Sequence, residues 1–232
     1  MKRFFATEIQ DNKAILSEEE SHHCLQVLRT RDGETVEITD GKGYLWAAEV
    51  QIISKKQFSI HLHRPLITDA PNPAVCSLAV ALTKNIDRIE WMLEKATEIG
   101  LNEFYPVITH RTERRQVRMD RLEKIAVSAM KQSERLWKPV LHEPVSFEYF
   151  ICSSPQATKY IAHCEDEEHK NPLSEIYTKG QKSIILIGPE GDFTESEISI
   201  AIESGFQPVS LGNARLRVET AALAACTWMN LK

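Results

Sequence analysis

The sequence is poor in the features that mark several large classes of protein. Its five cysteines are scattered, odd in number and never spaced as a CxxC pair, which argues against a disulfide framework and a structural zinc site. No apolar run approaches the ~20 residues that span a bilayer, and the first ten residues lack the apolar core of a signal peptide. We therefore expect a globular protein of the cytoplasm.

Common cofactor motifs are also absent. The chain has neither a GxGxxG nor a Walker A sequence, so dinucleotide and nucleoside triphosphate binding lose their usual support. The eight histidines offer no metal site, because His22-His23 and the pair His61 and His63 lack partners at ligand spacings. We expect no bound metal.

Charge is unevenly distributed along the 232 residues. The net charge is −5, yet residues 108–138 carry nine Lys or Arg against four Asp or Glu, so this segment is +5 and the remainder is −10. A local basic field on an acidic protein suggests a face that meets phosphates. The alternative is a solvated helix with unmatched charges.

Residues 1–70 alternate apolar and polar positions and predict a small β-barrel with one helix over 17–30. Their polar decoration suits phosphate contact. The strand candidates are 2–9, 13–17, 33–40, 43–54 and 57–67, and the basic side chains considered are Arg3, His23, Arg29 and Arg31.

Residues 71–232 follow a different pattern after a connector that contains Pro71 and Pro73. Strands alternate with helices, which predicts an α/β domain with a parallel sheet covered on both faces. The expected strands are 76–84, 102–109, 158–164, 183–188 and 207–212, and the expected helices are 85–100, 119–136 and 218–231.

Two glycine-containing loops near the end of the chain suggest a ligand site. In SIILIGPEGDF, residues 183–193, an apolar strand stops at Gly188-Pro189 before a helix whose Thr194 and Glu197 match a capping box. LGNARLRVETAALAA, residues 211–225, repeats this order. One such loop is an ordinary strand-to-helix connection, but two so close together favour a shared ligand crevice.

These stretches resemble the RsmE family of the SPOUT superfamily. The resemblance lies in IGPEGDFTESEI, LGNARLRVETAALAA, TKNIDRIEWMLEKATEIG and the run Met130-Lys131-Gln132-Ser133, and it extends to RFF and HHCLQVLR, which are similar to the family's PUA-like RNA-binding barrel. It implies a barrel over 1–70 and a trefoil-knotted methyltransferase domain over 71–232. It also implies S-adenosylmethionine as cofactor, a homodimer, and methylation of N3 of uridine 1498, in standard ribosomal numbering, in 16S RNA, either naked or in the assembled small subunit.

The resemblance assigns roles to individual residues. Arg217, then Arg111 and Arg135, are candidates to stabilise the charge that develops on the uracil, while no side chain stands out as the base that removes the N3 proton. Arg114 and Arg115 join the barrel residues as RNA contacts. The implied cofactor-binding residues are Ile187, Gly188, Pro189, Glu190, Gly191, Leu211, Gly212, Leu216, Arg217, Thr220 and Ala221.

Three features leave alternatives open. Glu190 could contact the cofactor or cap backbone donors of its own loop. The family's GPEGG is Gly191-Asp192 here, and aspartate tolerates a positive φ, while His110 stands where the family often has glutamate. The rival functions are a SPOUT enzyme that acts on transfer RNA or ribose, and a non-catalytic RNA-binding assembly factor.

Overall fold

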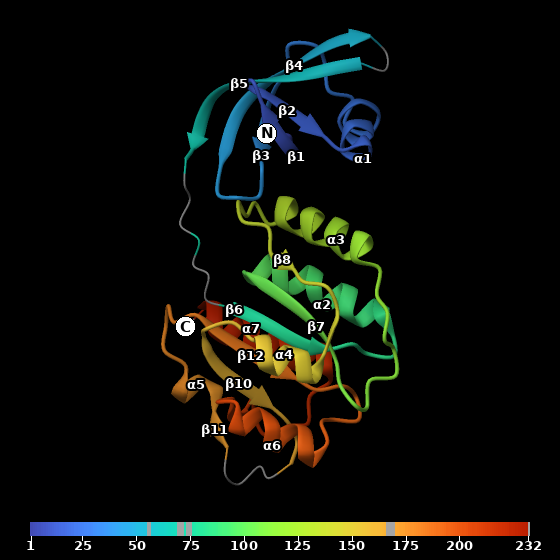
Figure 1. Cartoon of the computed structure of the whole chain (residues 1–232). Helices are drawn as coiled ribbons and strands as arrows, with labels where there is room; N and C mark the ends of the chain where they lie inside the picture. Colours follow the sequence, from blue (N-terminus) through green and yellow to red (C-terminus); the bar gives the residue numbers. More distant parts are fainter. Residues whose placement is uncertain (55–56, 69–71, 73–75, 166–169, 232) are drawn as a thin grey trace. The chain divides into compact units, whose positions relative to one another are not determined.

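The computed structural model describes residues 1–54, 57–68, 72, 76–165 and 170–231, which belong to two compact units (Figure 1). The first unit joins Met1–Asn72 to Met130–Lys138, and the second joins Pro73–Ala129 to Pro139–Lys232. The expected division at residue 70 placed all of Met130–Lys138 in the C-terminal domain. Within the described part of the chain, every helix is too short or too polar to cross a bilayer.

The first unit is a closed barrel of five strands, as the alternating N-terminal pattern predicts. The strands succeed one another in the order β1-β2-β5-β4-β3; β1 and β3 are parallel and the other neighbours are antiparallel. Alternate side chains such as Phe4, Val36 and Ile38 fill the interior. The strands are β1 (Arg3–Gln10), β2 (Lys13–Leu16), β3 (Thr35–Thr39), β4 (Leu45–Ser54) and β5 (Gln57–Ile67).

The predicted N-terminal helix is shorter than expected and changes type. α1 (Glu18–His22) begins where the Ser17 hydroxyl accepts the Glu20 N–H at 3.2 Å, and a π-helical turn, η1 (His23–Val27), follows. The turn places Cys24 in the barrel core. A wider turn rotates the side chains that follow it, which the apolar pattern alone does not reveal.

The second segment of the first unit adds to the edge of the turn between β3 and β4. The Lys138 N–H donates to the Gly41 carbonyl and the Gly43 N–H donates to the Leu136 carbonyl, both at 2.9 Å. Gly41 has a φ of 70°, and a Cβ there would lie 3.0 Å from the Lys138 Cβ. Glycine is therefore required both for the turn and for the close approach of this segment.

An ion pair ties the same segment to the first strand and helix of the barrel. The Lys131 Nζ lies 2.7 Å from both carboxylate oxygens of Glu20, and Glu20 also accepts the Phe5 N–H at 2.9 Å. The Lys131 and Glu20 side chains are only 16% and 12% exposed, so the pair is largely shielded from water. Two motifs that are far apart in sequence, RFF and the run that begins at Met130, thus meet in one unit.

The second unit contains an eight-stranded sheet in the order β11-β13-β10-β12-β6-β7-β8, with β9 paired to β7. Every pairing is parallel, as the alternation of strands and helices predicts. The strands are β6 (Cys76–Ala81), β7 (Glu103–Ile108), β8 (Val140–Leu141), β9 (Val145–Ser146), β10 (Thr158–Ala162), β11 (Asn171–Pro172), β12 (Ser183–Ile187) and β13 (Gln207–Ser210).

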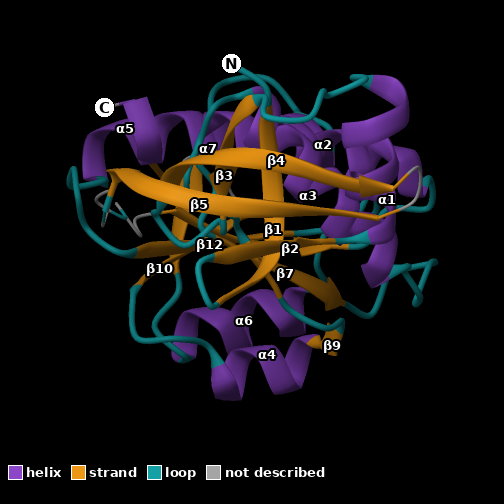
Figure 2. Cartoon of the chain, turned by 90° about the horizontal axis from the view of Figure 1, so that it is seen from above, coloured by secondary structure: helices purple, strands orange, loops and turns teal. Residues whose placement is uncertain are grey.

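Helices cover both faces of this sheet, α4 and α6 on one face and α2 and α7 on the other (Figure 2). Of the three predicted helices, α2 ends at Gly100 as expected, with a φ of 128° there, and α3 begins in the second unit and ends in the first. The helices are α2 (Ile86–Ile99), α3 (Met119–Gln132), α4 (Phe147–Ser153), α5 (Leu173–Ile176), α6 (Glu195–Glu203) and α7 (Val218–Leu231).

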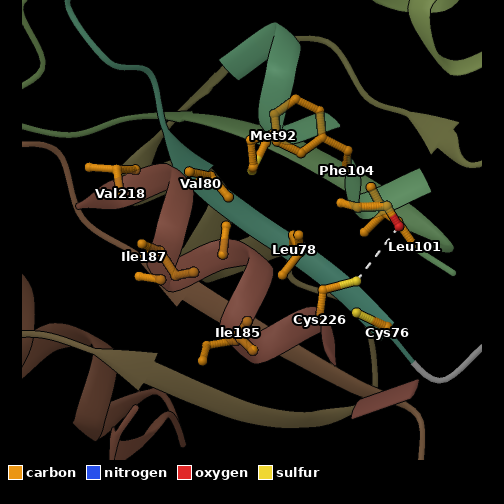
Figure 3. Packing of buried hydrophobic residues seen from close by; sticks show 14 of the residues in the cluster. Cys76, Leu78, Val80, Met92, Leu101, Phe104, Ile185, Ile187, Val218 and Cys226 are labelled. Carbon is orange, nitrogen blue, oxygen red and sulfur yellow. Dashed lines mark hydrogen bonds between the residues drawn. The ribbon is translucent and has the colours of Figure 1, made fainter. Parts of the chain in front are cut away.

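Two apolar cores follow from the buried strands. Ile185 and Ile187 of β12 join the core under α2 and α7, whereas Ile184 and Leu186 join the core under α4 and α6. Figure 3 shows the first core, in which the Cys226 thiol of α7 donates to the Ala96 carbonyl of α2 at 3.7 Å. The alanine-rich face of α7, with Ala221, Ala222 and Ala225, therefore packs in the core of its own unit. The trefoil knot stays a prediction.

A polar cluster lies at the start of β7. Glu103 accepts hydrogen bonds from the Tyr105 hydroxyl and, at 3.2 Å, from His142, and the Lys182 Nζ lies 3.3 Å from it. Burial alone would raise the pKa of Glu103, but the Tyr105 hydrogen bond, the Lys182 charge and the His142 hydrogen bond outweigh it and lower that pKa. Burial and the same hydrogen bond raise the pKa of Tyr105.

Candidate functional site

A cavity of about 430 Å³ lies where three neighbouring parallel strands end. The residues after β12 and after β13 both line it, and so do Ala162, His163 and Cys164 at the end of β10. Its volume falls in the range of roughly 300–1,000 Å³ typical of ligand sites. Gly188 and Gly212 thus border one hollow, which is the arrangement that the two loops predict.

Most of the predicted cofactor residues line this cavity. Only Gly191 and Thr220 of that set do not, while the structure adds the β10 residues together with Arg88, Lys170, Asp192 and Arg215. β10 lies between β12 and β13 in the sheet, so its end necessarily joins theirs. The predicted residues in the wall are Ile187, Gly188, Pro189, Glu190, Leu211, Gly212, Leu216, Arg217 and Ala221.

Gly188 is the point of closest packing in the first loop. A Cβ at this position would lie 3.0 Å from two carbons of the buried Phe193 ring and 3.1 Å from the Asp192 Oδ1. The ring belongs to the core beneath α4 and α6, so it cannot move aside freely. A side chain at Gly188 would therefore displace the loop that lines the cavity.

Asp192 completes the turn with a φ of 62°, which confirms that aspartate can replace the last glycine of the family's GPEGG. Its Oδ1 accepts the Phe193 N–H at 2.8 Å, and its Oδ2 accepts the Cys164 N–H at 2.7 Å. Asp192 thus ties the loop after β12 to the end of β10. Its negative charge is engaged by backbone donors, although the residue lines the cavity.

The helix after this turn begins with the predicted capping box. The Thr194 hydroxyl accepts the Glu197 N–H at 3.2 Å, and the Glu197 carboxylate accepts the Thr194 N–H at 2.8 Å. Glu197, which is 5% exposed, also accepts the His110 N–H at 2.8 Å. His110 therefore meets a buried carboxylate through its backbone, which needs no particular side chain at that position.

Arg111 supports the same turn instead of facing the cavity. Its Nη1 donates to the Gly191 carbonyl at 2.7 Å and to the Phe193 carbonyl at 3.2 Å. Arg111 does not line the cavity, and its bonds give it a positioning role in the loop. Only Arg217 of the three catalytic candidates lines the cavity, and Arg135 belongs to the first unit.

The second loop is open where the first is packed. Gly212 has a φ of 132°, and a Cβ there would meet nothing within 4 Å. The Ser210 hydroxyl accepts the Gly212 N–H at 3.3 Å and donates to its carbonyl at 3.1 Å. Backbone conformation, not space, thus favours glycine at this position.

Glu190 has a structural contact and also lines the cavity. Its Oε1 accepts the Lys84 N–H at 3.2 Å, and the Lys84 carbonyl accepts the Arg114 Nε–H at 3.2 Å. The backbone of Lys84 thus joins the connection before α2 to the basic loop after β7 and, through Glu190, to the glycine loop. Cys164 also lines the cavity. Its burial, followed by the negative charge of Asp192, raises the pKa of the thiol, so the thiol is neutral.

The side chains predicted to contact RNA differ in their exposure and in their interactions with other residues. The Arg3 guanidinium pairs with Glu37 at 2.8 Å and is 14% exposed, whereas Arg31 and Arg115 are exposed. His23 packs edge-on against Phe4, and Arg29 has a φ of 48°.

Among the described residues, no group of three His, Cys, Asp or Glu side chains could hold a metal ion.

Comparisons with known proteins agree with this architecture. A family model described as an RNA methyltransferase domain matches residues 70–230, and one described as an RNA methyltransferase PUA domain matches residues 16–62. Ribosomal RNA small subunit methyltransferase E of Synechocystis sp. is 31% identical over 217 residues, which cover 90% of this chain and 70% of the relative. The protein of that name from Rickettsia conorii is 28% identical over 94% of this chain and 88% of its own length.

Solved structures also match the chain over its whole length. A probable rRNA-methyltransferase from Porphyromonas gingivalis is 38% identical with a TM-score of 0.90, covering 100% of this chain and 98% of that one. The ribosomal RNA small subunit methyltransferase E of Neisseria gonorrhoeae, bound to S-adenosyl methionine, is 31% identical with a TM-score of 0.87, covering 100% and 97%. Because both the methyltransferase and the PUA descriptions match, and the cavity lies between the motif loops, this chain belongs to the RsmE family of RNA methyltransferases.

Proposed function

We propose that the protein transfers a methyl group from S-adenosylmethionine to N3 of one uridine in small-subunit ribosomal RNA. The observation that carries this proposal is the cavity that the Gly188 and Gly212 loops share. Family membership supports methyl transfer to RNA, and the names of the relatives support the small subunit as the source of that RNA.

The walls of the cavity suit an adenosyl group. Ile187, Leu211, Leu216 and Ala221 offer apolar surface, and the loop backbones bring N–H and C=O groups near the edges of a bound base. The absence of a side chain at Gly188 lets the lining loop pack closely against Phe193. S-adenosylmethionine would supply an electrophilic methyl group on a sulfonium.

The chain's own contribution is positioning and charge stabilisation. Uridine N3 carries a proton at neutral pH, and its loss places negative charge on the flanking carbonyl oxygens. Arg217 is exposed and lines the cavity, where its guanidinium can donate to such an oxygen. Arg111 holds the loop after β12 through the Gly191 and Phe193 carbonyl groups and would thereby help to position the bound cofactor.

RNA binding is assigned to basic residues outside the cavity. Arg114 and Arg115 lie in the exposed loop after β7. Arg3, His23, Arg29 and Arg31 lie on the barrel, and the charge of Arg3 is partly offset by Glu37. Cations that neutralise phosphates make binding fall steeply with added salt. The partner is the small-subunit RNA, free or assembled.

We also propose that the enzyme is a knotted homodimer in the cytoplasm. α2 and α7 pack against each other, and each carries an exposed tryptophan, Trp91 at 48% and Trp228 at 43%. Exposed aromatic side chains of this size are typical of interfaces. Sedimentation should give a dimer, and Trp228→Lys should shift it toward monomer; a monomeric parent protein would contradict this part of the proposal.

The decisive experiment combines labelled methyl transfer with primer extension. Small subunits and their naked RNA, from cells that lack the enzyme, should accept methyl groups at one uridine that then stops reverse transcriptase. Gly188→Val should abolish transfer while the protein stays folded. A methyl group on ribose or on transfer RNA would show a different specificity, and RNA binding without transfer would show an assembly factor.

A further inference from the structure

An ion pair beside the cavity joins two residues to which no role has been assigned, Arg88 and Glu219. Arg88 lies in the first turn of α2 and lines the cavity. Glu219 lies in the first turn of α7, directly after the lining residue Val218. The Arg88 Nη1 is 3.7 Å from the Glu219 Oε1, which is a charge contact but too long for a hydrogen bond.

Both members of this pair are incompletely satisfied. Among the described residues, no side-chain hydrogen bond reaches the Arg88 guanidinium, although it carries five N–H donors. Glu219 is 8% exposed, and its Oε2 is buried without a hydrogen-bond partner. Buried acceptors without a partner are few in native structures, because leaving one unpaired is costly.

The other charged residues that line the cavity are already engaged or are exposed. Lys170 donates to the His163 carbonyl at 2.6 Å, and Asp192 and Glu190 accept backbone N–H groups. Arg215 and Arg217 are exposed, as suits contact with RNA. The Arg88 side chain is 35% exposed, and Arg88 is less exposed than Arg215 and Arg217. Its N–H donors are therefore available to a ligand in the cavity.

We propose that Arg88 binds the carboxylate of the amino-acid end of S-adenosylmethionine, with Glu219 as the positioning residue that holds the guanidinium in the wall. The inference rests on the proposed function, since it names a contact of that cofactor. A guanidinium matches a carboxylate with two parallel N–H donors. Glu219 acts through its charge, because the buried carboxylate attracts the Arg88 guanidinium and restrains this long side chain.

Two ligands that differ at this end test the proposal. S-adenosylhomocysteine has the amino acid, and 5′-methylthioadenosine has the same adenosyl group without it. Arg88→Ala should weaken S-adenosylhomocysteine binding roughly 10- to 100-fold in calorimetry and leave 5′-methylthioadenosine binding unchanged. Arg88→Lys should recover part of the loss, because it restores the charge without the fork.

The positioning role has its own readout. Glu219→Gln should weaken S-adenosylhomocysteine by a smaller factor than Arg88→Ala and again spare 5′-methylthioadenosine. If Arg88→Ala fails to fold because Glu219 is left unpaired, Arg88→Met combined with Glu219→Gln removes both charges together. Arg121→Ala is the matched control. Arg121 of α3 pairs at 2.6 Å with Glu90, which lies in α2 as Arg88 does, and neither Arg121 nor Glu90 lines the cavity.

The outcomes separate the two proposals. Equal loss of both ligands in the Arg88 variants would show a structural residue, and no loss of either would show that Arg88 faces something else; each result overturns the inference. If the unmodified protein binds neither ligand, the proposed function itself fails. Selective loss of S-adenosylhomocysteine, absent in Arg121→Ala, supports the assignment.

Discussion

Replacement of Asp192 tests how the first cavity loop is held. The carboxylate accepts the Cys164 and Phe193 N–H groups at 2.7 and 2.8 Å, and the backbone has a φ of 62°. Asp192→Ala removes both bonds, at about 1 kcal/mol each for partly exposed donors. It also places a poorer residue in the left-handed region, at about 1 kcal/mol more. We expect the free energy of unfolding to fall by about 3 kcal/mol.

Two further variants divide this loss into its parts. Asp192→Gly loses the same bonds but adopts a positive φ freely, so it should cost about 2 kcal/mol. Asp192→Asn keeps one acceptor oxygen and should cost about 1 kcal/mol. The expected order of stability is therefore Asp, Asn, Gly and Ala, measured by urea unfolding, and S-adenosylhomocysteine affinity should follow the same order.

Asp11 provides the control for the backbone effect. It has a φ of 50°, lies in the turn between β1 and β2 and accepts no side-chain hydrogen bond in the described structure, so Asp11→Gly should not destabilise the protein. If Asp192→Gly were as stable as the parent protein, the two carboxylate contacts would contribute nothing. If Ala and Gly were equally stable at 192, the argument from φ would be wrong.

Three other predictions concern different parts of the chain. Lys131→Ala should lower the free energy of unfolding by about 2–3 kcal/mol, because it leaves the largely buried Glu20 carboxylate unpaired; Lys131→Ala with Glu20→Gln should recover part of this in urea titrations. The lowered pKa of Glu103 gives stability that is present above pH 4.5 and lost as the pH falls through the folded-state pKa; in acid titrations of unfolding, Glu103→Gln should flatten this loss. Arg111→Ala should weaken S-adenosylhomocysteine binding and lower kcat together, with partial recovery in Arg111→Lys; unchanged affinity with lowered kcat would instead mark Arg111 as a catalytic residue.

Local patterns predicted the elements that make the cavity. Four consecutive apolar residues before Gly188 and the Thr194–Glu197 spacing are enough to indicate a buried strand, a turn and a capped helix, and the structure confirms each of them. The shared hollow follows from two such loops at the ends of parallel strands. The strand, the turn and the capped helix could be predicted because each depends on residues that are close together in the sequence.

What the sequence did not reveal depends on distant partners. His163 and Cys164 line the cavity because β10 lies between β12 and β13, an order that no local pattern encodes. Arg111 was a catalytic candidate by resemblance, and only the fold shows its bonds to carbonyl groups 80 residues or more away. The role of Asp192 as a tie to β10 is hidden for the same reason.

The return of Met130–Lys138 to the first unit limits how this protein can be divided. Cutting the chain near Asn72 would release a barrel whose Glu20 has lost its cation and whose Gly41 carbonyl and Gly43 N–H have lost their partners. The remaining fragment would carry a stretch adapted to a surface that is no longer present. The barrel therefore cannot be transferred to another enzyme as residues 1–72 alone. Such a fusion would also need Met130–Lys138.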